Sequence, residues 1–467
     1  MKSLKSAIII GLLAMVVATM DSAKAQTIFD NTIFYHSFRA PMSSHINPTL
    51  FPYKAQWYVS LPNLDLGLSL PFSYNDLGLY YDPQRDVSVL NLNHVIDQMS
   101  SNKLGLAVSS NVDLLGFGVR LADFATLHVA SGLRTHNRIA IPMGIVEFLQ
   151  EGNAGEQRQF NFGSDDILSS QTWMYASLGG SFRIPELPIS IGATVNLLSG
   201  LQSFKVDQVK MDLTTADDMS YIQFTADYMA HSAGVAGLCV DDSGSLVFHP
   251  TLSMPQSWGV SMDVGARAKL GMVDLSVSLV DLGQGIFWQE NPIAIVPKTR
   301  ETTIRFDGID VSQLLQDGGL NRELLSAWID SLKNLPDYAV TEASHSMSIP
   351  TKLYFGASVT FLKMLRAGYL LHGEWDKKEI KTTFRCNNTL SLHANLMNWL
   401  EVAVANSFSY DGDNLNWFNP GVSLMLSMGG SFQCYLAADF VSNMYLANMK
   451  SARLMVGVNI VGKHGKK

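Results

Sequence analysis

The sequence predicts an all-β fold, a transmembrane antiparallel β-barrel of about 14 strands with short loop or plug helices. Three features predict it: an export signal, few charged residues without any long apolar run, and repeated alternation of apolar and polar residues. Of the 467 residues, 47% are hydrophobic and 16% are charged. Because soluble domains contain roughly 25% charged residues, this deficit is typical of a barrel wall, where half of each strand faces lipid.

The N-terminus has the features of a cleaved signal peptide. Lys2 and Lys5 precede an apolar core at residues 7–19, and Ala23-Lys24-Ala25 fits a cleavage site between Ala25 and Gln26. The core is short for a membrane-spanning helix, which needs roughly 20 residues, so an uncleaved anchor is the weaker alternative. The mature chain is therefore expected to be exported and to begin at Gln26.

After Gln26, alternation of apolar and polar residues is the main structural signal. In residues 257–270 the even positions, from Trp258 and Val260 onward, are apolar, whereas the odd positions are small or polar. A period of two over this length predicts a strand that crosses a bilayer at a tilt, with its even positions facing lipid. Comparable patterns occur at residues 189–197, 352–361, 421–428, 432–440 and 454–460. In lipid, such strands need barrel closure because an open edge would leave backbone groups unpaired.

The expected domain organisation follows from these signals. Residues 1–25 are the signal peptide, residues 26–54 an N-terminal periplasmic or plug segment, residues 55–462 the barrel, and residues 463–467 a basic tail. Helix-like patterns at residues 93–101, 142–150 and 311–334 fit loop helices or elements within the lumen. Many aromatic residues fall near expected strand ends, which predicts girdles at the membrane interfaces; they are Trp57, Tyr58, Trp173, Tyr175, Trp258, Trp288, Tyr354, Trp399, Tyr410, Trp417 and Tyr445.

Composition and motifs argue against several function classes. A net charge of −8 is unsuited to nucleic-acid binding, which needs clustered Lys and Arg. Cys239, Cys386 and Cys434 form neither a disulfide framework nor a C-x-x-C metal motif. The glycine and lysine spacing of residues 457–463 is that of a phosphate-binding loop, but His464 stands where Ser or Thr is required. We therefore predict no catalytic, cofactor-binding or metal-binding residue, and no enzymatic activity.

One group of charged residues is expected inside the barrel. Asp263 and Arg267 are four residues apart on one strand face, Lys269 is two further on, and Asp274 is on the next strand. Their alternation with apolar residues places them in the lumen. Two interpretations remain open: a charged constriction that tunes what passes, or an ion-pair network that fills a closed lumen.

Several short motifs resemble a known family. The segment from Asp281, Leu282 and Gly283 to Trp288, which is expected to follow a strand pair, resembles the D-L-G-x-I-x-W signature of an uncharacterised Bacteroidota outer-membrane barrel family of unknown function. Further matching pieces are Leu61-Pro62, residues 349–354 and residues 457–460. Asn47-Pro48 resembles the Asn-Pro segment of long-chain fatty-acid transporters and of barrels associated with type IX secretion. The resemblance implies a barrel and a compartment, and it implies no reaction.

These observations favour a non-enzymatic barrel in the outer membrane of a diderm bacterium. It would act as a conduit or transporter for hydrophobic small molecules. The alternative is a structural or partner-binding barrel of a secretion or surface-assembly complex. A third interpretation is a soluble exported all-β protein or enzyme. The expected partners are outer-membrane lipid, the barrel-assembly machinery and either a hydrophobic ligand or secretion-complex proteins. No cofactor and no nucleic acid are expected.

Overall fold

The structure is a computed structural model and describes most of the chain from Thr32 to Lys463. The described residues are 32–70, 73–75, 80–82, 87–89, 103–142, 159–161, 164–215, 222–240, 246–248, 255–298, 302–306, 338–362, 364–377, 382–397, 399–411, 414–429, 431–439, 441 and 445–463. The proposed cleavage site between Ala25 and Gln26, and the helix-like segments apart from Pro142, lie outside these ranges. Pro142 ends a strand.

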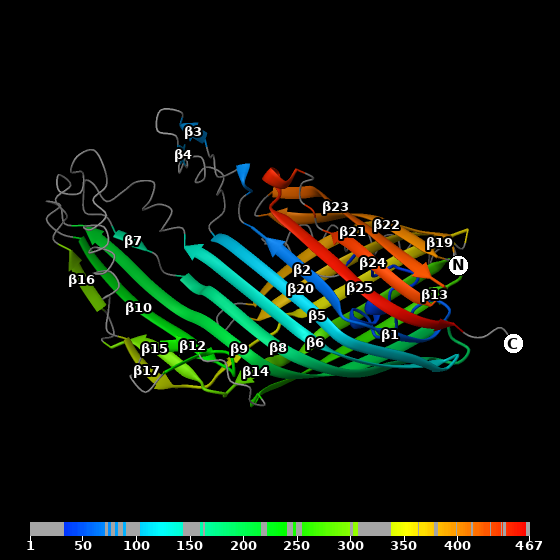
Figure 1. The fold of residues 1–467 in the computed structure, drawn as a ribbon, viewed down its shortest axis with the longest axis horizontal. Coiled ribbons are helices and arrows are strands. Elements are labelled where there is room, and N and C mark those ends of the chain that lie inside the picture. The colour runs from blue at the N-terminus through cyan, green and yellow to red at the C-terminus, as the bar shows by residue number, and fades with distance from the viewer. Residues whose placement is uncertain are drawn as a thin grey trace, which may run out of the picture.

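The wall is a closed antiparallel barrel of 14 strands (Figure 1). The first wall strand is formed by β1 (Ala55–Ser60) and β2 (Asn63–Ser69), which are separated by Leu61-Pro62. The other wall strands are β5 (Lys103–Ala122), β6 (Ala125–Pro142), β8 (Ser164–Arg183), β9 (Ile189–Thr215), β13 (Ser257–Leu270), β14 (Val273–Trp288), β19 (Thr351–Phe361), β20 (Leu365–Lys377), β21 (Thr382–Met397), β22 (Leu400–Asp411), β23 (Asn414–Met428), β24 (Phe432–Asp439) and β25 (Ser451–Lys463). Pairing of β25 with β1 and β2 closes the wall.

The barrel has two different ends. At one end consecutive strands are joined by short turns, as between β5 and β6 or between β13 and β14; we call it the turn end. Most connections at the other end, which we call the loop end, are longer, although β22 and β23 are joined there by only two residues. There the second half of β9 leaves β13 and pairs with β10 (Ile222–Ala233), which pairs in turn with β15 (Ile293–Pro297) and β16 (Thr302–Phe306). With β17 (Tyr338–Glu342) these strands extend the sheet beyond the wall, at the left of Figure 1.

The remaining elements are short. They are β3 (Tyr80–Asp82), β4 (Val87–Val89), β7 (Gln159–Asn161), β11 (Leu238–Val240), β12 (Leu246–Phe248), β18 (His345–Met347), and the 3-10 helices η1 (Pro41–His45) and η4 (Leu446–Asn448). Within the described residues, no helix has the length and apolar character needed to cross a bilayer.

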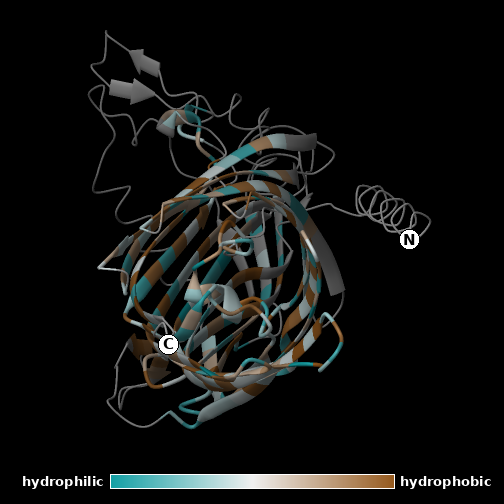
Figure 2. Ribbon diagram, turned by 90° about the vertical axis from the view of Figure 1, so that its right-hand side faces the viewer, coloured by the Kyte–Doolittle hydropathy of each residue, from teal (hydrophilic) through white to brown (hydrophobic). Residues whose placement is uncertain are grey.

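The predicted faces of β13 are confirmed. Trp258, Val260 and Met262 are 55%, 56% and 42% exposed, whereas Ser261 and Asp263 are buried in the lumen. Figure 2 shows the same alternation of hydrophobic and hydrophilic residues along the wall strands. The outward face is apolar because it meets lipid, and the inward face is polar because its partners are other polar groups of the lumen.

We expect Val260→Arg to lower the free energy of unfolding by roughly 2–4 kcal/mol, because it places a charge on the lipid-facing side of the wall. Ser261→Arg is costly for another reason: Ser261 is 2% exposed and accepts a hydrogen bond from Asn196 Nδ2 at 3.2 Å, so a guanidinium has no room. Stability therefore does not separate the two faces. Single fluorescent labels do: lipid-attached quenchers should quench labels at the outward positions 258, 260 and 262, but not at 269, an inward position that is exposed and has room for a label. Equal quenching at the outward positions and at 269 would contradict the membrane-spanning assignment.

The aromatic residues divide between the two faces, so the expectation of interfacial girdles is only partly correct. Exposed members are Trp57, Trp258, Trp399, Trp417 and Tyr445, whereas Tyr58, Trp173, Tyr175, Trp288 and Tyr354 are buried. The buried group points inward and packs inside the barrel. The closeness of an aromatic residue to a strand end could not reveal its face, because adjacent residues of a strand point to opposite faces, one toward lipid and the other toward the lumen.

Candidate functional site

The N-terminal segment, residues 32–54, lies inside the barrel and fills the lumen; we call it the plug. Most of its residues up to Pro52 are buried, and in Figure 1 it is the dark blue chain enclosed by the wall strands near β1. Its backbone has little regular structure apart from η1, so side chains of the wall satisfy many of its polar groups. A loop can be buried only where such partners exist.

Wall carboxylates hold the first part of the plug. Asp439 accepts hydrogen bonds from Thr32 Oγ1 at 2.7 Å and from the Ile33 amide at 3.1 Å. Glu401 accepts hydrogen bonds from Ser37 Oγ at 2.8 Å and from the Phe38 amide at 3.0 Å. Hydrogen bonds to an ionised acceptor are roughly twice as strong as those between neutral groups. These two carboxylates therefore fix the path of the plug across the lumen.

Further polar contacts continue along the plug. Arg39 donates from Nη2 to Asn395 Oδ1 at 2.5 Å and from Nη1 to Ser427 Oγ at 3.1 Å. His36 Nε2 lies 3.1 Å from the Tyr369 carbonyl and must donate to it, because a carbonyl only accepts. Burial lowers the pKa of His36 to about 3, with smaller contributions from His393 and Arg366. The imidazole is therefore neutral near pH 7.

Asn47-Pro48 lies within the barrel and is packed between two wall strands. Asn47 is fully buried, its Nδ2 donates to the Val277 carbonyl at 3.3 Å, and its Oδ1 accepts from the Thr49 amide at 3.0 Å. A Cβ added to Gly265 would lie 2.3 Å from Asn47 Oδ1, and one added to Gly192 would lie 3.0 Å from Pro48 Cβ. The absence of side chains at these two wall positions makes the space that Asn47-Pro48 occupies.

Two more wall glycines receive aromatic rings of the plug. A Cβ on Gly356 would lie 2.3 Å from the Tyr35 ring, and a Cβ on Gly368 would lie 2.3 Å from the His36 ring. We call Gly192, Gly265, Gly356 and Gly368 the notch glycines. They belong to four different strands, so the plug fits the wall at several separate points.

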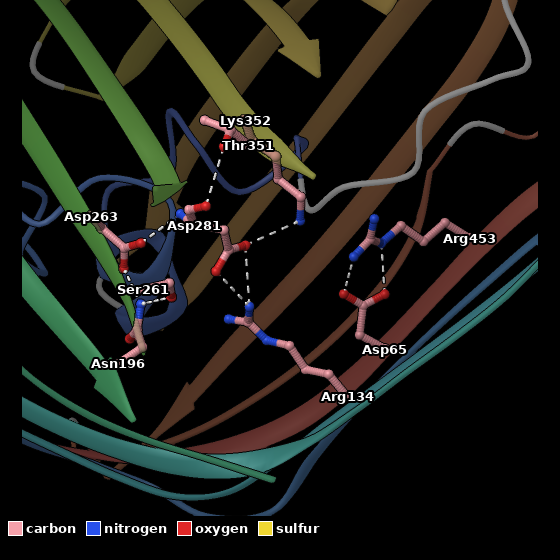
Figure 3. A network of polar contacts seen from close by, with 9 residues as sticks. All are labelled: Asp65, Arg134, Asn196, Ser261, Asp263, Asp281, Thr351, Lys352 and Arg453. Carbon is pink, nitrogen blue, oxygen red and sulfur yellow. Dashed lines mark hydrogen bonds and ion pairs between the residues drawn. The ribbon is translucent and has the colours of Figure 1, made fainter. Parts of the chain in front are cut away.

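A charged network lies on the loop side of the plug (Figure 3). Asp281 is 1% exposed and pairs with Arg134 at 3.3 Å and with Lys352 at 3.9 Å. Arg453 makes a bidentate ion pair with Asp65. Asp281, Arg134, Lys352 and Asp65 converge from distant strands on a cavity of about 60 Å³, which is also lined by Met42, His45 and Ile46 of the plug. Among the described residues, little free volume is left at this level of the lumen.

The four charged residues predicted to cluster form two separate groups. Asp263 accepts from Asn196 Nδ2 at 3.0 Å and from the Asp281 amide at 2.8 Å, and so belongs to the network of Figure 3. Arg267 and Asp274 make a bidentate ion pair nearer the turn end. Lys269 is exposed at that end. Arg134, Lys352, Asp65 and Arg453 were not predicted; each is an inward residue of an alternating strand, which is the signal that could have indicated them.

The motif that begins at Asp281 lies within β14, and does not follow a strand pair as predicted. Asp281 has a φ of 58° and Gly285 a φ of 90°, and the pairing of β14 with β19 and β18 is interrupted between Val280 and Ile286. This irregularity turns Asp281 into the lumen. Gly285 is required because a Cβ there would lie 2.0 Å from the Met347 carbonyl oxygen and the positive φ favours glycine.

Trp288, the last residue of that motif, belongs to an apolar cluster inside the loop-end half of the barrel. Trp173 and Trp288 are fully buried there, together with Leu198, Ile286, Met347 and Ile349. The Trp288 ring stacks with His345 at a centroid distance of 6.4 Å. A water-filled pore would not carry such a cluster, because its lining is polar.

No group of His, Cys, Asp or Glu in the described ranges is arranged to hold a metal ion. Together, the closed wall and the buried N-terminal segment define a plugged transmembrane β-barrel. The chain belongs to a family of unknown function (DUF5723), whose model matches residues 48–439. The resemblance to an uncharacterised family of unknown function is confirmed to this extent.

Comparisons with solved structures and curated proteins add the following. The chain is similar to the Ralstonia pickettii toluene transporter TbuX, at 8% identity over 91% of this chain and 94% of that one, with a TM-score of 0.43. It is similar to the Pseudomonas putida toluene transporter TodX, at 8% identity over 94% and 98%, with a TM-score of 0.42. It is also similar to a Pseudomonas aeruginosa FadL homologue, at 11% identity over 94% and 99%, with a TM-score of 0.41. No curated protein matches.

Proposed function

We propose that this protein is a gated outer-membrane conduit for hydrophobic small molecules, with the plug as its gate. The observation that carries the proposal is the position of the plug between two cavities. The smaller, of about 60 Å³, lies on its loop side, and one of about 400 Å³ lies at the turn end. Passage through the lumen then requires the plug to move.

The apolar side chains in the loop-end half of the lumen support the proposal that the transported molecule is hydrophobic. The apolar cluster around Trp173 and Trp288 lies inside the loop-end half of the barrel, and two further apolar clusters pack the plug against the wall. Sites for apolar small molecules are lined by aromatic and aliphatic side chains with few polar groups. A solute that enters from the loop end would meet this cluster before it reaches the charged network and the plug.

The hydrogen bonds between the plug and the wall support the proposal that the plug can move as a gate. The plug contacts the wall through hydrogen bonds and notch contacts and through apolar packing, such as that of Phe34 against Tyr435 at a centroid distance of 5.2 Å. A typical hydrogen bond contributes only roughly 1 kcal/mol net, so the polar contacts can exchange for water when the plug withdraws toward the turn end. In this proposal the turn end faces the periplasm and the loop end faces the exterior, because outer-membrane barrels have short periplasmic turns and longer extracellular loops.

A disulfide lock tests the proposal. Thr32→Cys with Asp439→Cys joins the plug to β24, in a background where Cys239, Cys386 and Cys434 are replaced by Ala. In intact cells, barrel production should raise the uptake rate of N-phenyl-1-naphthylamine, an apolar fluorophore. Oxidation of the lock should return the rate to that of cells without the barrel, and a reductant should restore it. Uptake that is independent of the barrel, or equal with the lock open and closed, would refute the conduit.

The second candidate is a structural or partner-binding barrel of a secretion or surface-assembly complex. The sheet of β10, β15, β16 and β17 favours it, because it projects beyond the wall at the loop end. The dense filling of the lumen favours it as well. Uptake at the background rate, together with stable recovery of other envelope proteins after mild crosslinking, is the result expected for this alternative.

A further inference from the structure

The cavity at the turn end has an unusual charge. Its lining combines six cationic side chains with two carboxylates, a surplus of four positive charges in a chain whose net charge is −8. The cations are Lys54, Arg120, Arg183, Arg267, Lys269 and Arg366, and the carboxylates are Asp123 and Asp274. We call this cavity the basic vestibule. It lies between the plug and the wall strands and has a volume of about 400 Å³.

Among the described residues, only part of this positive charge is neutralised. The carboxylate of Asp274 is engaged in the bidentate pair with Arg267. Arg183, Arg267, Lys269 and Arg366 line the same cavity. The charges of the three arginines repel the Lys269 ammonium, and Asp274 attracts it. Repulsion of this kind costs stability unless an anion is bound.

Two of the arginines are held in place by the protein. Arg366 donates from Nη1 to the His36 carbonyl at 2.8 Å and from Nε to Thr360 Oγ1 at 3.2 Å. Arg120 lies over the Phe51 ring at 5.3 Å, and its buried Nε has no hydrogen-bond acceptor among the described residues. A buried donor that lacks an acceptor costs free energy, and a bound anion would supply one.

We propose that the basic vestibule binds a phosphate group. A phosphate monoester carries about two negative charges and three strong acceptor oxygens, whereas a carboxylate would offset only one of the four surplus charges. Arginine forks suit phosphate oxygens, and Lys269 adds a mobile ammonium. The exposed rings of Tyr53 and Phe124, at 56% and 51%, stand at the rim, so the vestibule is reached from the turn end. The phosphate can come from a soluble ester or from a lipid headgroup.

The test measures binding of inorganic pyrophosphate by calorimetry to the purified barrel in phosphatidylcholine nanodiscs. We expect saturable binding that weakens as salt rises. Arg183→Gln with Lys269→Gln removes two exposed cations and should raise the dissociation constant at least about tenfold, because each removes a charge-assisted contact. Lys210→Gln, an exposed lysine at the loop end of β9, is the control and should leave the constant unchanged.

Two further arms complete the experiment. In nanodiscs that contain phosphatidylglycerol, a raised apparent dissociation constant supports the site and identifies the lipid headgroup as an occupant. An unchanged constant supports the site for a soluble phosphate ester. Absence of saturable binding, or equal binding by the double variant and the wild type, would overturn the proposal. The outcome is independent of uptake through the lumen, so failure here and failure of the conduit are distinguishable.

Discussion

Replacing Asp281 with Asn is expected to lower the free energy of unfolding by roughly 3–5 kcal/mol, the usual cost of removing one partner from a buried ion pair. Asp281 is 1% exposed, and its partners Arg134 and Lys352 have side-chain exposures of 18% and 12%. The amide keeps the size of the carboxylate, so little cavity forms and the loss is electrostatic. Urea titration of the barrel in lipid vesicles measures the effect.

Two controls separate this loss from a general effect of charge removal. Asp123→Asn changes the same charge at an exposed turn and should shift the free energy by less than about 0.5 kcal/mol. Asp281→Asn combined with Arg134→Gln should cost less than the sum of the two single changes, because the uncompensated guanidinium is gone. If Asp281→Asn is as stable as the wild type, the network of Figure 3 does not hold the barrel together.

Gly265→Ala should displace the plug from its contact with the wall. The added methyl group would lie 2.3 Å from Asn47 Oδ1 and 3.1 Å from Pro48 Cδ, so the Asn47-Pro48 segment has to move. Overpacking of this kind costs roughly 1–3 kcal/mol, and each 1.4 kcal/mol changes a population about tenfold. The plug segment in proteoliposomes should therefore be cleaved by protease about tenfold faster, and planar bilayers should show openings that the wild type lacks.

Matched variants make this result specific. Ala266→Val adds methyl groups on the outward side of the same strand and should leave cleavage unchanged, since lipid accommodates them. Asn47→Ala removes the colliding carboxamide, so Gly265→Ala in that background should add little further effect. Equal cleavage of Gly265→Ala and wild type would mean that the notch glycines do not seat the plug.

The role of Asp281 was not predictable from residue spacing. Alternation along β14 places Asp274, Ser276 and Ser278 in the lumen and would therefore place Asp281 toward lipid. The irregular backbone from Asp281 to Gly285 breaks that period and turns the carboxylate inward. The motif itself was recognised from the sequence. The role of its Asp281 depends on an ion pair with Arg134, which lies 147 positions earlier in the chain.

The sequence by itself determined the barrel and the lipid face of β13, because a period of two and the cost of charge in lipid are local rules that each strand obeys alone. It predicted the strand number only as about 14. Only the tertiary structure decided the state of the lumen. Whether Phe38 meets Glu401 and Asn47 meets Gly265 depends on barrel closure and on which wall positions are glycine, and these are relations between residues far apart in the chain. The basic vestibule is of the same kind: Arg120, Arg183 and Arg366 are unrelated in sequence, and closure of the wall brings them around one cavity.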